Sequence, residues 1–113
     1  SHITYAKVKI KNPNETILKQ VFMTLAQRLK CELTNTVRDY YGRQVKVLFG
    51  LNVGRGIGVI IRNNELVVVG DPYNWESRYN EIKNLIQQYY IALSYASVLS
   101  QMGYQIQLQE VKA

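Results

Sequence analysis

The chain has 113 residues, a length that fits one domain with one hydrophobic core. Hydrophobic residues make up 47% of it, as in an ordinary globular protein, and its longest apolar stretch is too short and too polar for a membrane span. The single cysteine, Cys31, excludes an internal disulfide framework and a cysteine-rich metal site. We therefore expect one cytoplasmic domain over residues 1–113, with no signal peptide at its start and no membrane partner.

The net charge of +6 is unevenly distributed along the chain. Residues 1–62 carry eleven Lys or Arg against three acidic residues, whereas residues 63–113 carry a net charge of −2. A basic half of this kind can face nucleic acid or an acidic partner, or it can be an ordinary solvated surface.

The first quarter of the chain predicts a strand followed by a helix. Residues 3–11 alternate between apolar and basic side chains, the pattern of a half-buried strand with a basic outer face. Pro13 ends this strand, and Asn14 is the expected N-cap of a helix over residues 15–30. The apolar stripe of that helix consists of Leu18, Val21, Phe22, Leu25 and Leu29.

The middle of the chain predicts an antiparallel meander. Strands are expected over residues 32–37, 43–52, 57–62 and 65–69, with a turn at residues 39–42. Asn63-Asn64 suits a two-residue type I′ hairpin turn, because Asn tolerates positive φ. Residues 66–69 of the last strand are continuously apolar, so this strand is expected to be central and covered on both faces, with either the domain or a partner covering the second face.

The stretch from 75 to 102 predicts one long helix, because it contains no Pro or Gly. Asn74 is the expected N-cap and Gly103 stands just past the end. Its 28 residues span roughly 42 Å, more than the diameter of about 34 Å expected for the whole globule. After Tyr89 the helix carries apolar side chains on several faces, so it either bends or projects and is covered by another chain.

Residues 104–111 alternate again and predict a final strand. The element order is then β-α-β-β-β-β-α-β, an α+β single two-layer domain with a mainly antiparallel sheet. The first and last strands are expected to join the same sheet. Their shared outer face would present Tyr5, Lys7, Lys9, Gln105, Gln107 and Gln109.

Four segments carry a resemblance to a known family: residues 1–4 (SHIT), 37–42 (VRDYYG), 58–61 (GVII) and 65–71 (ELVVVGD). They resemble small uncharacterised proteins of cyanobacteria, plastids and other prokaryotes, which begin Met-Ser-His-Phe and end with a Tyr-Ala-containing helix, a Gly and a strand. Tyr95-Ala96 and Gly103 match that ending, whereas Ile3 replaces the usual Phe and Pro72-Tyr73 an aromatic pair. The resemblance covers nearly the whole chain and implies no defined activity. Genes of the family often neighbour one for an AAA-type ATPase, which implies an accessory, partner-binding role.

No residue pattern indicates catalysis. The glycine-rich loop at residues 54–58 lacks the Lys-Ser/Thr of a phosphate-binding loop and joins two strands, so hairpin glycines explain it better. Cys31 follows the C-terminus of a helix, the wrong end for lowering a thiol pKa. His2 has no nearby partner for acid–base work, and Ser1-His2 is either native or a tag remnant. We expect no enzyme activity, no catalytic residue, no metal and no cofactor.

Two functional classes remain. The first is a non-enzymatic protein-interaction or assembly module that forms homo-oligomers and is an accessory to an ATPase if the resemblance holds. Its expected interface is Tyr90, Ile91, Tyr95, Val98 and Met102. The alternative is a basic nucleic-acid-binding protein with little sequence specificity. Its expected binding residues are Tyr5, Lys7, Lys9, Lys11, Arg38, Arg43 and Lys46.

The polar and aromatic residues 38–43 have two interpretations. Arg and Tyr together can hold phosphates and stack on bases. Equally, Asp39 can satisfy the backbone of the turn while the Tyr rings cover the edge of the core. A shared exposed face for Lys7, Lys9 and Lys46 would favour nucleic-acid binding, and scattered placement would favour the assembly module.

Overall fold

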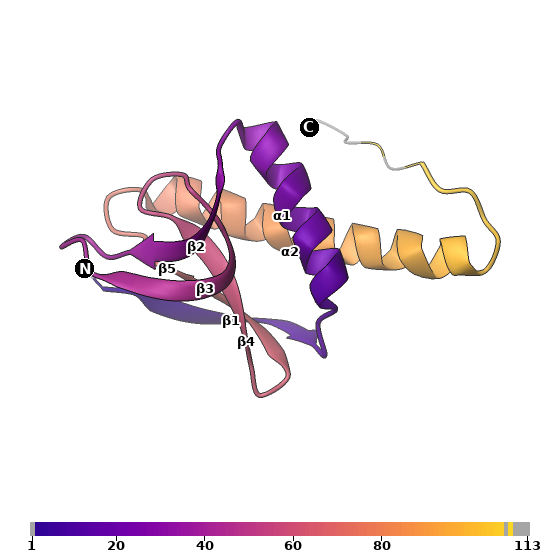
Figure 1. The fold of residues 1–113 in the computed structure, drawn as a ribbon, viewed down its shortest axis with the longest axis horizontal. Coiled ribbons are helices and arrows are strands. Elements are labelled where there is room, and N and C mark those ends of the chain that lie inside the picture. The colour runs from indigo at the N-terminus through magenta and orange to yellow at the C-terminus, as the bar shows by residue number, and fades with distance from the viewer. Residues whose placement is uncertain (1, 108, 110–113) are drawn as a thin grey trace.

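The computed structural model describes residues 2–107 and 109. In this part of the chain, the elements follow the order β1 (Thr4–Lys11), α1 (Glu15–Leu29), β2 (Leu33–Arg38), β3 (Gln44–Leu51), β4 (Ile57–Arg62), β5 (Glu65–Gly70) and α2 (Glu76–Gln101). The strands form one sheet in the spatial order β1-β5-β4-β3-β2, and every neighbouring pair is antiparallel (Figure 1). The predicted α+β class is confirmed.

The main core lies between the sheet and the two helices. Phe22 of α1 and Ile86 of α2 are fully buried there against Val59 and Val68 of the sheet. The apolar stripes follow the helical period, so each helix buries one side and leaves the other in solvent. Both helices therefore cover the same face of the sheet.

Strand β5 lies inside the sheet, between β1 and β4, and is buried on both faces, as predicted. Leu66 and Val68 belong to the main core, whereas Val67 and Val69 point to the other side of the sheet. There they form a second cluster, which consists of Val37, Val47, Val67 and Val69. The continuous apolar sequence of β5 is thus explained within one chain.

Local sequence signals explain several boundaries. The side chain of Asn14 accepts a hydrogen bond from the backbone N–H of Ile17 at 3.0 Å, which confirms it as the N-cap of α1. Asn63 and Asn64 have φ values of 51° and 61°, which confirms the positive-φ turn between β4 and β5. In β1 the pairing register shifts between Lys7 and Lys11, and Lys9 there has a φ of 60°.

The prediction that Asn74 caps α2 is wrong. Asn74 has a φ of 63°, and Trp75 occupies the N-cap position without a side-chain capping bond. The indole Nε1 of Trp75 instead donates to the carbonyl of Asp71 at 2.7 Å, so a tertiary contact fixes the start of the helix. At the other end Gly103 has a φ of 91° and its N–H donates to the carbonyl of Ser100 at 3.0 Å, which confirms the predicted stop.

The predicted final strand is wrong for the described residues. Residues 104–107 and Gln109 belong to no strand, and the rest of the predicted segment, 108 and 110–111, lies outside the described residues. Strand β1 pairs with β5 instead. An alternating segment becomes a strand only beside a neighbouring strand. Here α2 ends far from the sheet, so the face predicted to combine Lys7 with Gln105 is not formed.

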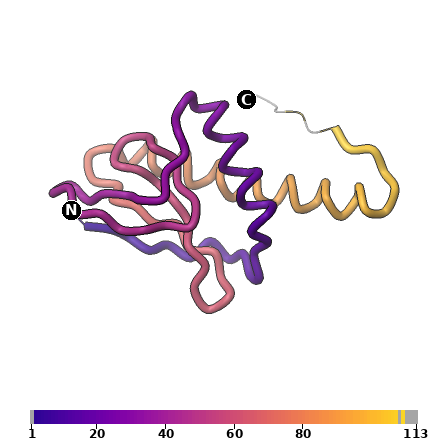
Figure 2. Tube along the Cα trace, viewed as in Figure 1, coloured from indigo at the N-terminus to yellow at the C-terminus, as the bar shows by residue number. Residues whose placement is uncertain are grey.

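Helix α2 projects from the domain instead of bending around it. Its 26 residues span about 39 Å, and the longest dimension of the molecule is 49 Å. Figures 1 and 2 show α2 crossing α1 and continuing well beyond it, away from the sheet. Among residues 2–107 and 109, neither helix is long and apolar enough to cross a membrane.

Candidate interaction surface

Polar contacts join the ends of α1 to α2 near the point where α2 leaves the domain. The hydroxyl of Tyr90 accepts the backbone N–H of Asn14 at 2.8 Å. One residue earlier, Arg28 donates to the hydroxyl of Tyr89 at 2.8 Å and places its guanidinium 5.8 Å from the ring centre. Tyr90 is only 8% exposed. The prediction that Tyr90 lies in an oligomer interface is therefore corrected: it belongs to the core.

The other four residues of the predicted interface are exposed and share one side of α2. We call them the apolar seam: Ile91, Tyr95, Val98 and Met102. Their exposed fractions lie between 55% and 69%. They follow one another at steps of four, three and four residues, which is the heptad spacing of a coiled-coil contact line. At about 100° per residue, this line points away from the buried stripe that contains Ile82 and Ile86.

The half of α2 that carries the apolar seam has no charged residue. Lys83 is the last charged residue of α2, and from Asn84 to Gln101 the polar residues are Ser, Gln, Asn and Tyr. Tyr104 and Ile106 follow the helix and are 60% and 39% exposed. The four residues of the apolar seam expose on the order of 500 Å² of surface, taking about 150–250 Å² for each fully exposed large side chain. A monomer rarely shows a larger patch.

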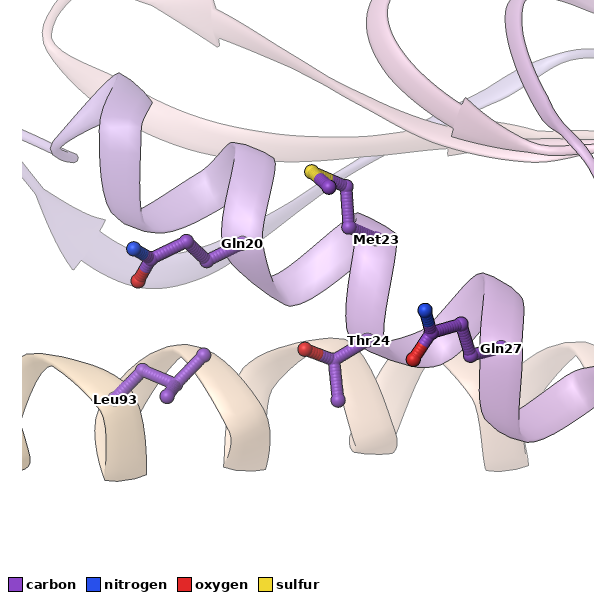
Figure 3. Close-up of a pocket in the computed structure, with 5 residues that line it drawn as sticks. All are labelled: Gln20, Met23, Thr24, Gln27 and Leu93. Carbon is purple, nitrogen blue, oxygen red and sulfur yellow. The ribbon is translucent and has the colours of Figure 1, made fainter.

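A shallow groove of about 320 Å³ lies between α1 and α2 (Figure 3). Its lining residues are Gln20, Met23, Thr24, Gln27 and Leu93. Leu93 is two residues from Ile91, so the groove and the apolar seam lie on nearly opposite sides of α2. Met23 lines this groove and is 47% exposed on the otherwise polar side of α1. An apolar residue on a polar helix face is the sequence feature that could have indicated the groove.

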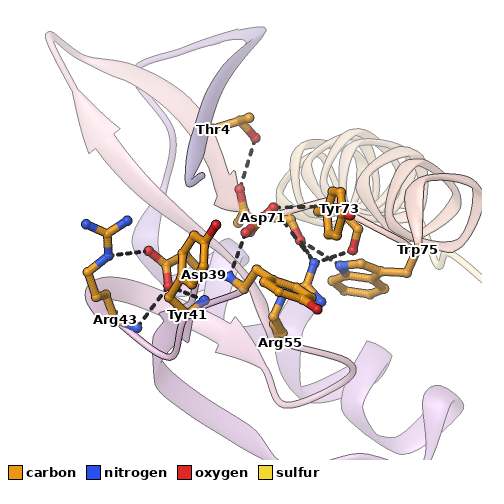
Figure 4. A network of polar contacts seen from close by, with 10 residues as sticks. Thr4, Asp39, Tyr41, Arg43, Arg55, Asp71, Tyr73 and Trp75 are labelled. Atoms are coloured by element: carbon orange, nitrogen blue, oxygen red, sulfur yellow. Dashed lines mark hydrogen bonds and ion pairs between the residues drawn. The ribbon is translucent and has the colours of Figure 1, made fainter. Parts of the chain in front are cut away.

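The turn at residues 39–42 is held by a buried carboxylate (Figure 4). Asp39 is 4% exposed and accepts the backbone N–H groups of Tyr41 and Arg43, both at 2.9 Å. It also accepts the Nε–H of Arg43 at 2.7 Å. Burial alone raises the pKa of Asp39, but the hydrogen bonds from Arg43 and Tyr41 outweigh it, so the pKa lies below its ordinary value. This geometry supports the structural interpretation of the cluster.

The lowered pKa of Asp39 predicts an acid-dependent loss of stability. Its stabilising effect is complete above the unfolded-state pKa near 3.9 and is lost as the pH falls through the lower folded-state pKa. The variant Asp39→Asn should therefore show a smaller decrease in Tm between about pH 5 and pH 2 than the wild type. Thermal unfolding followed by circular dichroism at several pH values tests this. Parallel curves for both proteins would contradict it.

A second carboxylate ties three loops together (Figure 4). Asp71 is 1% exposed and accepts the backbone N–H of Tyr40 at 2.8 Å and that of Tyr73 at 3.0 Å. Its Oδ1 lies 3.8 Å from Nη2 of Arg55. The same nitrogen donates to the backbone carbonyls of Asp71 and Tyr73, and the guanidinium lies 5.6 Å from the ring centre of Tyr40. Arg55, the arginine of the glycine-rich loop, is thus engaged in structure.

The predicted basic residues do not form one face. Lys7 pairs with Val67 of the second cluster, so it lies on the side of the sheet without helices. Lys46 alternates with Val45 and Val47, which pack in that same cluster, so it projects to the opposite side.

Three further members of the predicted binding set are engaged within the chain. Arg43 pairs with Asp39, and Arg38 donates to the carbonyl of Gly54 at 3.3 Å. The ring of Tyr5 lies 4.6 Å from the guanidinium of Arg62. The stacking partner of Tyr5 was not identified from the sequence, because only the folded sheet brings the two residues together.

The surroundings of Cys31 do not activate its thiol. Burial raises the pKa of the Cys31 thiol above its ordinary value, and the backbone of Asn52 and the charge of Arg78 offset this only in part. A raised pKa disfavours the nucleophilic thiolate. Within residues 2–107 and 109, no group of three His, Cys, Asp or Glu residues is placed to hold a metal ion.

A comparison of the chain with models of protein families, with curated proteins and with solved structures finds no match. The resemblance noted from the sequence stays a prediction. The surface of the domain itself supplies the strongest functional feature, the apolar seam on the projecting half of α2.

Proposed function

We propose that the protein is a non-enzymatic assembly module that associates with other copies of itself through the apolar seam. The single observation that supports this is the heptad spacing of Ile91, Tyr95, Val98 and Met102 on the projecting half of α2, where the helix has no charged residue. Leaving such a surface in water is unfavourable, and covering it releases that cost. A helix end that the core does not use is otherwise hard to explain.

The scattered positions of Lys7 and Lys46, and the internal contacts of Arg38 and Arg43, favour this proposal over nucleic-acid binding. Proteins that bind single strands combine a continuous basic groove with exposed stacking rings. An AAA-type ATPase as a further partner is implied only by the family resemblance. In this proposal the ATPase would bind the homo-oligomer and not the single chain.

Replacing both Ile91 and Val98 by Glu should produce a monomer. Each protomer of a dimer would bring two carboxylates into the contact, and burying unpaired charges there is strongly unfavourable. The molar mass of wild type and variant can be measured by size-exclusion chromatography with light scattering over a concentration series up to about 200 μM, because the affinity of a small interface does not follow from its area.

The matched control places two Glu residues on the same helix face outside the apolar seam, as Asn84→Glu with Gln88→Glu. This control should keep the wild-type molar mass, and circular dichroism should show folded helix in both variants. A wild-type protein that remains monomeric at about 200 μM would overturn the proposal.

A further inference from the structure

We infer that two copies pair their α2 helices antiparallel along the apolar seam, so that Tyr95 of each copy packs against Val98 of the other. This inference rests on the proposed function and adds the partner, its orientation and its register. It follows from the spacing, size and charge of the exposed residues.

The area of the apolar seam is sufficient for a small interface with a second copy of the chain. A standard interface buries about 800 Å² on each partner. The apolar seam offers on the order of 500 Å², taking about 150–250 Å² for a large side chain. A two-fold pair uses the same patch on both partners, so this area is supplied twice. The result is a small, reversible interface.

The sizes of the seam residues favour the antiparallel orientation. In a parallel pair, Tyr95 would face Tyr95 of the other copy and Val98 would face Val98, which stacks two large and then two small side chains. In the antiparallel pair each Tyr95 faces a Val98 and each Ile91 faces a Met102. Large side chains then fill the space that small ones leave, as close packing requires.

Charge favours the same orientation. Each copy has a net charge of +6, whereas α2 carries no charged residue after Lys83. Parallel helices would place the two basic domains side by side at one end. Antiparallel helices place them at opposite ends of a paired segment about 16 Å long, which is beyond the Debye length of about 8–10 Å at ordinary salt. Antiparallel helix dipoles add a further favourable interaction.

Disulfide trapping distinguishes the two orientations. With Cys31→Ser as background, Ile91→Cys and Met102→Cys are made as separate proteins. In the antiparallel pair, identical positions lie about 16 Å apart along the axis, too far for a disulfide, whose Cα atoms lie within about 7 Å. Each variant alone should therefore remain uncrosslinked after mild oxidation, whereas an equimolar mixture should give up to half of its chains as crosslinked dimer on a non-reducing gel.

A mixture of Asn84→Cys with Met102→Cys sets the background, because in this register the two positions are about 10 Å apart. Light scattering on the same samples shows whether the chains form dimers at all, which tests the assembly function separately from the antiparallel pairing. Monomers throughout would overturn both the assembly function and the pairing. Dimers in which Ile91→Cys alone crosslinks as well as the mixture, or in which the mixture does not crosslink, would overturn the antiparallel pairing and leave the assembly function standing.

Discussion

Replacing Asp71 by Ala should lower the free energy of unfolding by about 3–5 kcal/mol, the range for removing one partner of a buried ion pair. The side chain of Asp71 is 1% exposed and that of Arg55 is 22% exposed. Without the carboxylate, the N–H groups of Tyr40 and Tyr73 lose their acceptor. These donors are partly buried, so leaving them without an acceptor is costly.

Urea denaturation followed by the fluorescence of Trp75, the single tryptophan, measures this effect at a fixed protein concentration. Asp71→Asn is the second variant, since it retains the shape and one acceptor oxygen and should lose less. The control is Glu81→Ala, which removes an exposed ion pair with Arg78 and should change stability by less than about 1 kcal/mol. Equal effects of Asp71→Ala and the control would show that the loop network contributes little.

Replacing Phe22 by Ala should be equally severe, with a loss of about 3–5 kcal/mol. The side chain of Phe22 is fully buried between α1 and the sheet, and its ring centre lies 6.0 Å from that of Phe49. Truncation removes the transfer free energy of the ring and leaves a cavity that rigid neighbours fill only in part.

The neighbouring residue gives a matched control for this substitution. Met23 lies on the same helix but is 47% exposed, so Met23→Ala should change stability by about 0.5 kcal/mol or less. Both variants are compared by urea denaturation under the same conditions. A difference of less than about 1 kcal/mol between them would mean that the main core tolerates the cavity, against the usual behaviour of close-packed interiors.

Regular local patterns were sufficient to predict the first seven elements. The alternation of β1, the cap of α1 by Asn14 and the Asn63-Asn64 turn are all set by residues close in sequence. The prediction of a final strand was wrong because alternation shows only that a segment has an apolar side and a polar side. Whether such a segment forms a strand depends on whether the edge of a sheet lies within its reach. At the end of a projecting helix, the described part of that segment has no edge beside it.

The residues of the predicted interface were likewise predicted correctly in part. Heptad spacing and lack of charge could be read from the sequence, and four of the five residues are exposed together. Tyr90 does not share that spacing, because it follows Ile82 and Ile86 at steps of four on the buried stripe. Its hydroxyl accepts the backbone N–H of Asn14, 76 residues away. The start of α2 depends on the tertiary hydrogen bond of the Trp75 indole, and no local pattern reports that contact.

The irregular outer strand of the sheet affects how copies can meet. A long, regular sheet edge invites strands of other molecules to add to it, and fibrils grow in this way. Here β1 carries three exposed lysines and a register shift at Lys9, whose φ of 60° interrupts the even row of backbone donors and acceptors. Open-ended stacking through this strand is disfavoured, so chains whose helix contact has been removed should stay dispersed instead of growing into fibrils.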